Sequence, residues 1–279
     1  MFSTFKNVAK ELLPPLVKTK LELARINYQL KHYKSRYVEH IYGGFPLKIH
    51  LTDPVAESWY DHDEWLEEGS EISLLKQHQL GRGAKVFNIG AHQCVVALVL
   101  AKIVGPGGMV VAVEANSHNT AIARENRDLN DALQLVIVEA AAADKSGTLL
   151  FREQLCGSVD DGSGRWAKRP VPCLSVDDLT LQYGVPQVLW IDVEGFEGKV
   201  LEGAAQTLKH RPDCFVEVHV GCGLETFGYS AESIVSFFRT TPYRLFVTRQ
   251  QGGAFDVLEP NSPLPDERFF LAALNLPKE

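Results

Sequence analysis

Apolar and polar positions change their spacing at Lys85, and from there short apolar runs alternate with segments of helical spacing. Seven runs have the length and composition of strands: 85–89, 109–113, 134–139, 187–191, 214–219, 243–248 and 268–274. Five helices are expected between them: 92–103, 117–129, 175–182, 196–209 and 230–239. Apolar strands that alternate with helices predict an α/β fold with a mostly parallel sheet covered on both faces. The last two strands are joined without an apolar helix, so we expect the last strand to be antiparallel.

The first 80 residues have a different pattern, which predicts an N-terminal helical extension with a short strand, ahead of a main domain at 81–279. Apolar positions with helical spacing, interrupted by Pro14-Pro15, are Phe5, Ala9, Leu12, Leu16, Leu23, Ile26, Leu30 and Tyr33. Alternation within 42–53 predicts a half-buried strand. Residues 63–80 predict one or two helices that end at Gly81.

Composition and charge narrow the classes of function. A chain of 279 residues with 45% hydrophobic side chains can bury one large α/β core. The net charge of −7 argues against nucleic acid as a partner, although residues 1–36 hold eight Lys or Arg and two Glu. We expect this basic segment to form a solvated helix packed on the acidic body. Contact with an acidic partner or a membrane surface is the alternative.

Cysteine usage and hydropathy indicate the compartment. The five cysteines include no CxxC pair, which fits a reducing compartment and provides no zinc framework. The N-terminus carries Lys6, Lys10 and Glu11 where a signal peptide needs an apolar core, and no apolar run approaches membrane-spanning length. We therefore expect a cytoplasmic protein without stable membrane insertion.

Ligands of an open α/β sheet bind outside the carboxyl ends of its strands, so the residues that follow each strand are informative. The first strand leads into Asn88-Ile89-Gly90-Ala91-His92, where glycine lets backbone amides approach a ligand at a helix N-terminus. After the second strand, Glu114 is placed to accept hydrogen bonds from the two hydroxyls of a ribose, or to cap the next helix. After the third, Asp144 is placed to accept a hydrogen bond from an adenine amine, or to form a turn.

The fourth and fifth strands end in acids and a histidine. "VLWIDVEGFEG" places Asp192 and Glu194 on one side of the chain if the strand extends that far. "FVEVH" does the same for Glu217 and His219. Because these side chains come from neighbouring strands and converge on one crevice, a functional site is favoured over a purely structural role. The Gly- and Ser-rich stretch 156–170 is either a loop that covers a substrate or a disordered one.

Five segments, in this order and spacing, resemble the FkbM family of S-adenosylmethionine-dependent methyltransferases: "VFNIGAHQCVVALVLA", "VVAVEANSHNTAIARENRDLN", "LSVDDL", "WIDVEGFEGKVLEGAAQTL" and "FVEVH". The match covers most of residues 81–220, and "IDVEGFE" and "EVH" are its most specific parts. The resemblance implies a seven-stranded, Rossmann-like class I methyltransferase fold and S-adenosylmethionine as cofactor. It also implies transfer of a methyl group to an oxygen, often a hydroxyl of a sugar or a natural product.

The resemblance assigns roles to single positions. The expected cofactor-binding residues are Asn88, Gly90, Ala91, His92, Glu114, Ala115, Asn119, Asp144 and Asp192. Other positions that match the family's pattern are Asn126, Asn130, Glu194, Gly195, Glu197, Glu217 and His219. Four positions depart from it, namely Asn88 (usually Asp), Cys94 (usually Gly), and Ala115 and Ser117 (usually Pro).

Methyl transfer to a hydroxyl is helped by a base, because a hydroxyl has a high pKa. His219 is the first candidate, since its unperturbed pKa lies nearest to working pH, and Glu194 is the second. Asp192 is expected to orient the cofactor or the acceptor. A metal bound by these three side chains would also lower the acceptor's pKa, but no ligand spacing demands one, and we expect none. The expected partner is a small-molecule or glycosylated hydroxyl acceptor, and a homodimer is one option for the oligomeric state.

Two other functions share parts of this pattern. A nicotinamide-dependent oxidoreductase has similar first strand ends, but it normally has a fuller GxGxxG and no role for "IDVEGFE". A catalytically silent cofactor-binding protein on the same fold would explain Asn88 and Cys94. We therefore expect an O-methyltransferase, with the silent binding protein as the main alternative.

Overall fold

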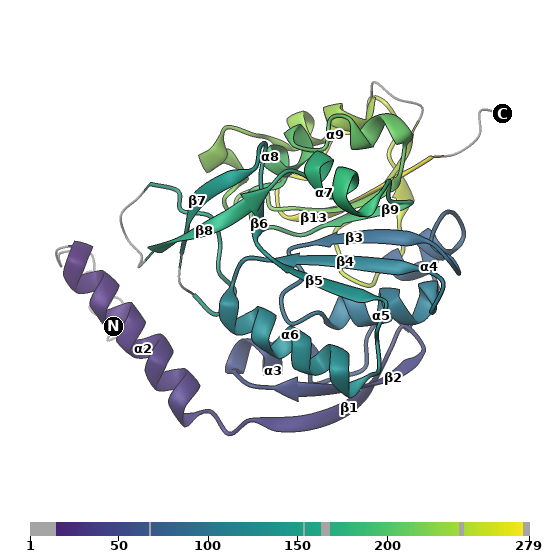
Figure 1. Cartoon of the computed structure of the whole chain (residues 1–279). Helices are drawn as coiled ribbons and strands as arrows, with labels where there is room; N and C mark the ends of the chain where they lie inside the picture. The colour runs from purple at the N-terminus through teal and green to yellow at the C-terminus, as the bar shows by residue number, and fades with distance from the viewer. Residues whose placement is uncertain (1–14, 67, 153, 163–167, 240–242, 276–279) are drawn as a thin grey trace.

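A mixed sheet of eight strands forms the centre of the computed structural model, which describes residues 15–66, 68–152, 154–162, 168–239 and 243–275. The strands lie in the order β12-β11-β13-β10-β9-β3-β4-β5 (Figure 1). Their bounds are β3 (Lys85–Ile89), β4 (Met109–Glu114), β5 (Leu135–Glu139), β9 (Val188–Ile191), β10 (Asp213–Val218), β11 (Arg244–Thr248), β12 (Asp256–Val257) and β13 (Phe269–Leu274). Neighbours from β10 to β5 are parallel, whereas β13 is antiparallel to both β10 and β11.

All seven predicted strands lie in this sheet, and the predicted antiparallel pairing of the last two is confirmed. The predicted count of seven needs a correction, because β12 adds an eighth strand. It pairs with β11 through Phe246 and Val247 and consists of two exposed residues. So short and exposed a strand has no hydrophobic pattern that a sequence could reveal.

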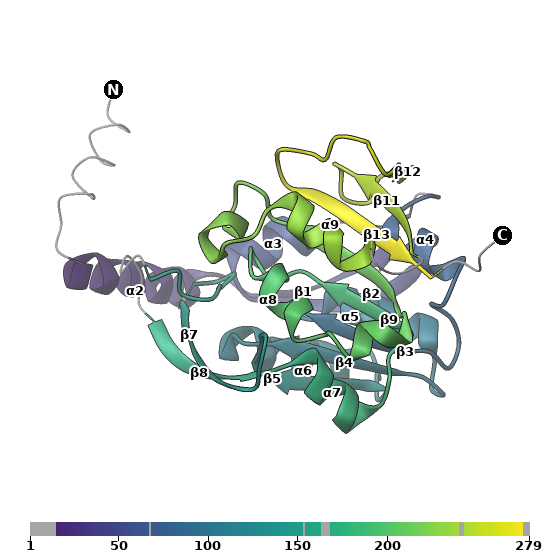
Figure 2. The ribbon, with the colours of Figure 1, turned by 90° about the horizontal axis from the view of Figure 1, so that it is seen from above.

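Helices cover both faces of the sheet, as predicted (Figure 2). One hydrophobic cluster contains buried residues of α5 (Val95–Val104), α6 (Ser117–Leu129), α3 (Pro54–Tyr60) and α4 (Glu71–Lys76). The other contains buried residues of α7 (Val176–Tyr183), α8 (Glu197–Glu202) and α9 (Ala231–Arg239). Because the central strands are buried on both faces, they have continuous apolar sequences.

Two helices are shorter than predicted, for reasons that lie in the backbone. α5 begins at Val95 rather than at residue 92, because His92 and Cys94 have φ angles of +48° and +66°. α8 ends at Glu202, and a short 3₁₀ helix, η1 (Thr207–His210), follows. Gly203 passes so close to another segment that a Cβ there would lie 2.1 Å from the carbonyl oxygen of Ala143.

The N-terminal region adds a hairpin of β1 (Arg36–Tyr42) and β2 (Phe45–Leu51), which packs against α5 and α6. The predicted strand is confirmed as β2, but β1 was not predicted. Two buried asparagines, one in α6 and one at its C-cap, form hydrogen bonds with the hairpin and so connect it to α6. Asn126 accepts a hydrogen bond from the amide of His50, and Asn130 both accepts from and donates to the backbone of Lys48.

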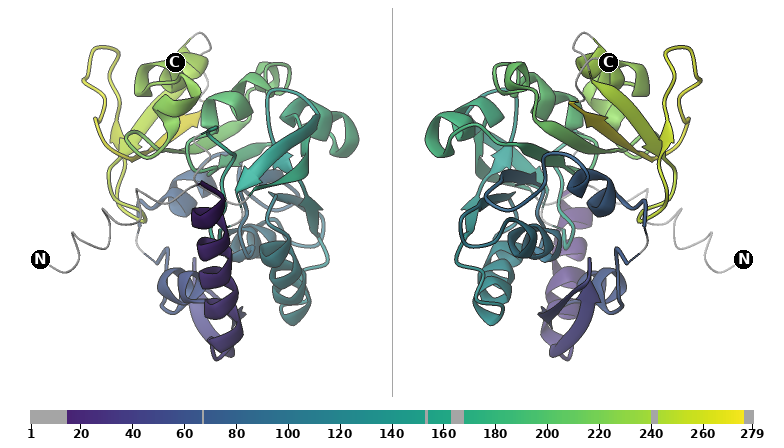
Figure 3. Two further views of the ribbon diagram at one scale, coloured as in Figure 1. Left: turned by 90° about the vertical axis from the view of Figure 1, so that its left-hand side faces the viewer. Right: turned by 90° about the vertical axis from the view of Figure 1, so that its right-hand side faces the viewer.

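Helix α2 (Pro15–His32) runs along the outside of the molecule (Figure 3). Its side chains Leu23, Ile26 and Leu30 line a groove together with Phe151 and Leu155 of the main domain. The expected helix around Phe5, Ala9 and Leu12 lies outside the described residues. Within the described part of the chain, no helix combines the length and the hydropathy that crossing a membrane requires.

A second, three-stranded sheet lies beside the first, with the order β6-β8-β7. Its strands are β6 (Ala141–Ala142), β7 (Gly147–Arg152) and β8 (Lys168–Leu174). The predicted loop 156–170 is therefore partly β-structure, because its last three residues belong to β8 and Val159 forms a bridge with Phe151. Arg165 and Trp166, which that prediction included, lie outside the described residues.

Candidate active site

The candidate site lies at the point in the sheet where the order of the strands along the chain changes direction. β3 has β4 on one side and β9 on the other, so the connections leaving β3 and β9 diverge and open a crevice at their carboxyl ends. Gly90 follows β3 with a φ of +83°, and a Cβ at this position would lie 1.7 Å from the carbonyl oxygen of Asp192. Only glycine allows the two strand ends to approach so closely.

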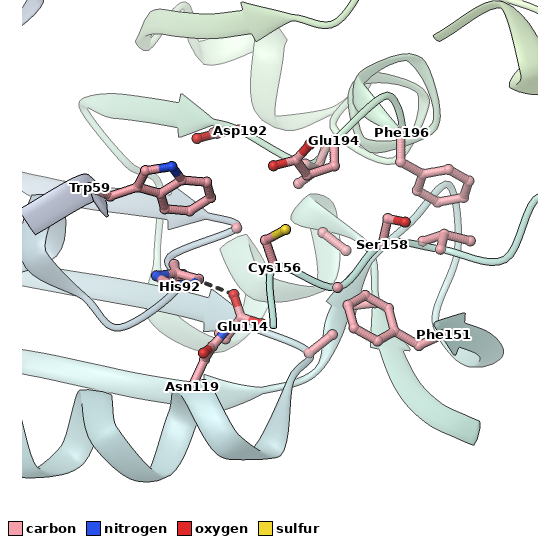
Figure 4. A pocket seen from close by; sticks show the side chains of 17 residues that line it. Trp59, His92, Glu114, Asn119, Phe151, Cys156, Ser158, Asp192, Glu194 and Phe196 are labelled. Carbon is pink, nitrogen blue, oxygen red and sulfur yellow. Dashed lines mark hydrogen bonds between the residues drawn. The ribbon is translucent and has the colours of Figure 1, made fainter. Parts of the chain in front are cut away.

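The first part of the crevice, which we call the inner cavity, contains the end of β4 (Figure 4). Glu114 is 8% exposed, and its two carboxylate oxygens accept hydrogen bonds from the amides of His92 (2.8 Å) and Asn116 (2.7 Å). Burial raises the pKa of Glu114. Asn119 lies beside it and donates to the carbonyl oxygen of Leu155. Other lining residues include Ala115, Ala141, Ala142, Phe151, Cys156, Gly157, Ser158, Val159 and Phe196.

The second part, which we call the tryptophan cavity, contains Trp59, Trp65 and Trp190 together with Asn88, Ala91, Glu217 and Arg268. It adjoins the inner cavity, because five residues line both: Trp59, Gly90, His92, Asp192 and Glu194. The crevice therefore offers two spaces that meet at a glycine and two carboxylates. Such an arrangement suits a reaction between two ligands, one in each space.

Asp192, Glu194 and Glu217 surround the ring of His219. Its Nε2 lies 3.8 Å from Asp192 Oδ1, 3.7 Å from Glu194 Oε2 and 3.4 Å from Glu217 Oε1. Removal from water, followed by the charge of Glu217, raises the pKa of Asp192 well above its usual range. Removal from water also raises the pKa of Glu194.

Glu197 completes this group on the other side of the ring. Its side chain is fully buried, and Oε1 accepts from the amide of Gly195 and lies 2.8 Å from His219 Nδ1. Burial lowers the pKa of His219, but the hydrogen bond to Glu197 and the surrounding carboxylates outweigh burial and raise the pKa to about 10. At neutral pH the ring is therefore an imidazolium unless another cation replaces its proton.

The structure brings most of the predicted site residues together. Those that line the inner cavity, the tryptophan cavity or both are Asn88, Gly90, Ala91, His92, Glu114, Ala115, Asn119, Asp192 and Glu194. His219 lines neither cavity, but its Nε2 lies within 3.8 Å of the carboxylates of Asp192 and Glu194. Asn88 lines the tryptophan cavity rather than the inner one. Asp144 lines neither, and its carboxylate lies 3.7 Å from Lys199 Nζ.

Several lining residues were not predicted from the sequence. Trp59 belongs to α3, in a region assigned to the extension, and Phe151 belongs to the second sheet. Cys156 and Ser158 lie at the start of the stretch 156–170, for which the sequence suggests a loop that covers a substrate. Their position in this stretch is the only sequence feature that points to a place in the site. Trp59 had no such signal, because its neighbours in the sequence carry no motif.

Acidification is expected to destabilise the protein through His92. Its ring is buried with Nδ1 2.9 Å from the Tyr60 hydroxyl, and burial lowers its pKa to about 4. Below the ordinary pKa of histidine, His92 is protonated in the unfolded chain, whereas in the folded protein it is protonated only near pH 4. The free energy of unfolding therefore falls as pH decreases through this window. From pH 7.5 to pH 5 the contribution of His92 to this loss should be about 2 kcal/mol. In urea unfolding, the stability of His92→Asn relative to the wild type should therefore rise by about this amount between pH 7.5 and pH 5, and an unchanged difference would contradict the assignment.

Comparison with known proteins identifies the family. The FkbM methyltransferase domain matches residues 88–245, more than half of the chain, so the chain belongs to this family. The resemblance seen in the sequence is thereby confirmed. A search of curated proteins finds no match.

Solved structures of low sequence identity are also similar. A methyltransferase FkbM from Methylobacillus flagellatus KT is 16% identical, with 68% of this chain and 43% of that chain covered and a TM-score of 0.45. This chain thus spans less than half the length of that protein. A precorrin-6y C5,15-methyltransferase from Geobacter metallireducens GS-15 is 16% identical, with coverages of 74% and 87% and a TM-score of 0.44. A SAM-dependent O-methyltransferase from Thermotoga maritima is 10% identical, with coverages of 91% and 82% and a TM-score of 0.45.

Proposed function

We propose that the protein is an S-adenosylmethionine-dependent O-methyltransferase that acts on a hydroxyl group of a small molecule, such as a sugar or a natural product. The observation that carries this proposal is the junction of the two cavities at Gly90, Asp192 and Glu194. A transferase must hold donor and acceptor in adjoining spaces with their reacting atoms in contact. Membership of a methyltransferase family supports methyl transfer as the reaction.

The inner cavity fits the cofactor. Each carboxylate oxygen of Glu114 accepts one backbone amide, so lone pairs remain for the hydroxyls of a ribose. Ala141, Ala142 and Phe151 form an apolar wall suited to a flat base. Gly90 lacks a side chain where the cofactor must approach the backbone. Asp144 lines neither cavity and lies beside Lys199, so the proposed cofactor contacts do not include it.

The tryptophan cavity fits a hydroxylated acceptor. Trp59 is 42% exposed and presents its indole ring beside Asp192 and Glu194 (Figure 4). An indole face packs against the C–H groups of a sugar ring, while carboxylates accept hydrogen bonds from its hydroxyls. Glu217 and Arg268 add further polar groups to the same cavity.

In the proposed reaction the inner cavity would hold S-adenosylmethionine, whose methyl group would form a carbon–oxygen bond to the acceptor as its bond to sulfur breaks and S-adenosylhomocysteine leaves. We assign the removal of the hydroxyl proton to Glu194, which borders both cavities and whose raised pKa lies closer to neutrality. His219, the first candidate from the sequence, has a pKa of about 10, and an imidazolium has no lone pair to accept a proton. Its ring instead orients the carboxylates and offsets their charge.

Cofactor binding is the direct test of the proposal. Calorimetry with S-adenosylhomocysteine should give saturable binding, and Glu114→Ala should weaken it by about 1–3 kcal/mol, because buried hydrogen bonds are lost. Glu139→Gln is the matched control, since Glu139 ends the neighbouring strand and lines neither cavity. Absence of binding at millimolar ligand would contradict the proposal.

A further inference from the structure

Two carboxylates and the ring of His219 place possible metal ligands close together. Asp192, Glu194 and His219 each offer one possible ligand atom, and these three atoms lie within 4.8 Å of one another. The separations from Nε2 to the oxygens of Asp192 and Glu194, 3.8 and 3.7 Å, are too long for good hydrogen bonds. The three side chains therefore converge without bonding one another.

These separations are close to those of ligands that share a metal ion. Two ligand atoms about 2.1 Å from one cation, at tetrahedral or octahedral angles, lie roughly 3.0–3.4 Å apart. Asp192 Oδ1 and Glu194 Oε2 would each need to approach Nε2 by about 0.3–0.8 Å to reach such separations. Both lie at the mouth of the crevice with 39% of their side chains exposed, so such movement is unobstructed by a packed core.

His219 is oriented as a metal-binding histidine is. Its Nδ1 is held at 2.8 Å by the fully buried Glu197, which leaves Nε2 directed at the other carboxylates. A carboxylate that accepts from one ring nitrogen while the other nitrogen faces the cation fixes both the tautomer and the direction of the ring. In such a state a cation takes the place of the proton on Nε2.

A second observation lies in the neighbouring strand. The amide oxygen of Asn88 has no hydrogen-bond partner within the described structure, and the residue is only 2% exposed. It lines the tryptophan cavity together with Asp192, Glu194 and Glu217. A buried polar atom without a partner is costly unless water or a ligand satisfies it. Asn88 thus points to an occupant of the cavity that the protein chain itself does not provide.

The charges of the group agree with this. Four carboxylates, those of Asp192, Glu194, Glu197 and Glu217, lie around one imidazole ring. One basic side chain, Arg268, forms an ion pair with this group, with its Nη1 2.8 Å from Glu217 Oε1. The group thus contains more carboxyl groups than basic side chains, an excess that a divalent cation bound between them would balance.

We propose that Asp192, Glu194 and His219 bind a divalent metal cation at the junction of the two cavities. Two carboxylate oxygens and one imidazole nitrogen suit a cation of intermediate hardness, for which Mn²⁺ is the probe. The role of the cation rests on the proposed function: once bound, it would hold the acceptor oxygen and lower the pKa of its hydroxyl, and the second oxygen of Glu194 would take the proton. The proposal replaces the expectation from the sequence that no metal is bound. These ligands have no motif spacing, because Asp192 and Glu194 follow β9 whereas His219 follows β10.

Mn²⁺ binding to the full chain tests the site without any assay of activity. Electron paramagnetic resonance of free Mn²⁺, measured with and without S-adenosylhomocysteine, should reveal one saturable site with a dissociation constant below the millimolar range. Asp192→Asn should weaken binding at least about tenfold, since it removes a ligand charge. Asp256→Asn, which removes an exposed carboxylate of β12, should bind as the wild type does. Equal affinity of both variants, or no binding by the wild type, would overturn the proposal.

Glu197→Gln provides a second test, because it keeps the size of the side chain but removes its charge. We expect about 10- to 100-fold weaker Mn²⁺ binding from the loss of orientation at His219. An unchanged affinity would contradict the assigned role of the Glu197–His219 pair. Calorimetry with S-adenosylhomocysteine separates the two proposals. If the wild-type protein does not bind S-adenosylhomocysteine, the proposed function is contradicted. A saturable Mn²⁺ site that depends on Asp192 would in that case still support the cation site.

Discussion

Glu194→Gln is expected to lower turnover by about 10²- to 10⁴-fold while leaving the affinity for S-adenosylhomocysteine nearly unchanged. Glutamine has the shape of glutamate but cannot accept a proton at neutral pH. Glu194 follows β9 with a φ of +53°, a conformation that directs its side chain to the border of both cavities. The cofactor's proposed contacts lie instead with Glu114 and Asn119, on the wall formed by β4 and α6. Chemistry and cofactor binding should therefore separate in this variant.

The measurement is the release of S-adenosylhomocysteine with an acceptor found by screening hydroxylated compounds. Glu139→Gln serves as the control, since it makes the same chemical change outside the cavities. If Glu194→Gln keeps near-normal turnover, Glu194 is not the base. A parallel fall in turnover and cofactor affinity would instead indicate that Glu194 positions the cofactor.

Glu197→Ala is expected to destabilise the folded protein by about 2–5 kcal/mol, because it leaves two buried hydrogen-bond donors without an acceptor. The change leaves the amide of Gly195 without its acceptor and the ring of His219 without the group that orients it. Both losses occur in a place that water does not reach, since Glu197 is fully buried. Few single substitutions outside the hydrophobic core have so large an expected effect.

Denaturant unfolding checks this expectation, with Glu202→Ala as the matched control on the same helix. Glu202 is 41% exposed and pairs with Lys199, so its loss should cost no more than about 1 kcal/mol. Similar stabilities of the two variants would show that the Glu197–His219 pair contributes little to folding. The measurement should include a chelator, so that bound metal does not mask the effect.

The sheet was largely predictable from the sequence, because its central strands are apolar throughout and their helices have clear periodicity. The errors have local causes. Residues His92 and Cys94 adopt left-handed conformations that helical spacing does not reveal. The end of α8 is set by the close approach of Gly203 to Ala143, a contact between segments distant in the sequence.

The site was predictable only in part, because strand ends are visible in a sequence and contacts between segments are not. Alternation placed Asp192 with Glu194 and Glu217 with His219, and the order of parallel strands brought the pairs together. Glu197 was noted only as a match to the family's pattern, and its bond to His219 depends on how α8 packs against β10. The hydrogen-bonding of Asn126 and Asn130 to the hairpin also required the fold.

Much of the tryptophan cavity lies outside the segment that the family shares. That segment spans residues 88–245, whereas Trp59 and Trp65 precede it and Gln251 and Arg268 follow it. Under the proposed function, relatives would keep a common donor site while their acceptor sites differ partly through these flanking regions. A protein trimmed to the shared segment would lack part of the tryptophan cavity, so differences in acceptor choice should be sought in alignments of these flanks.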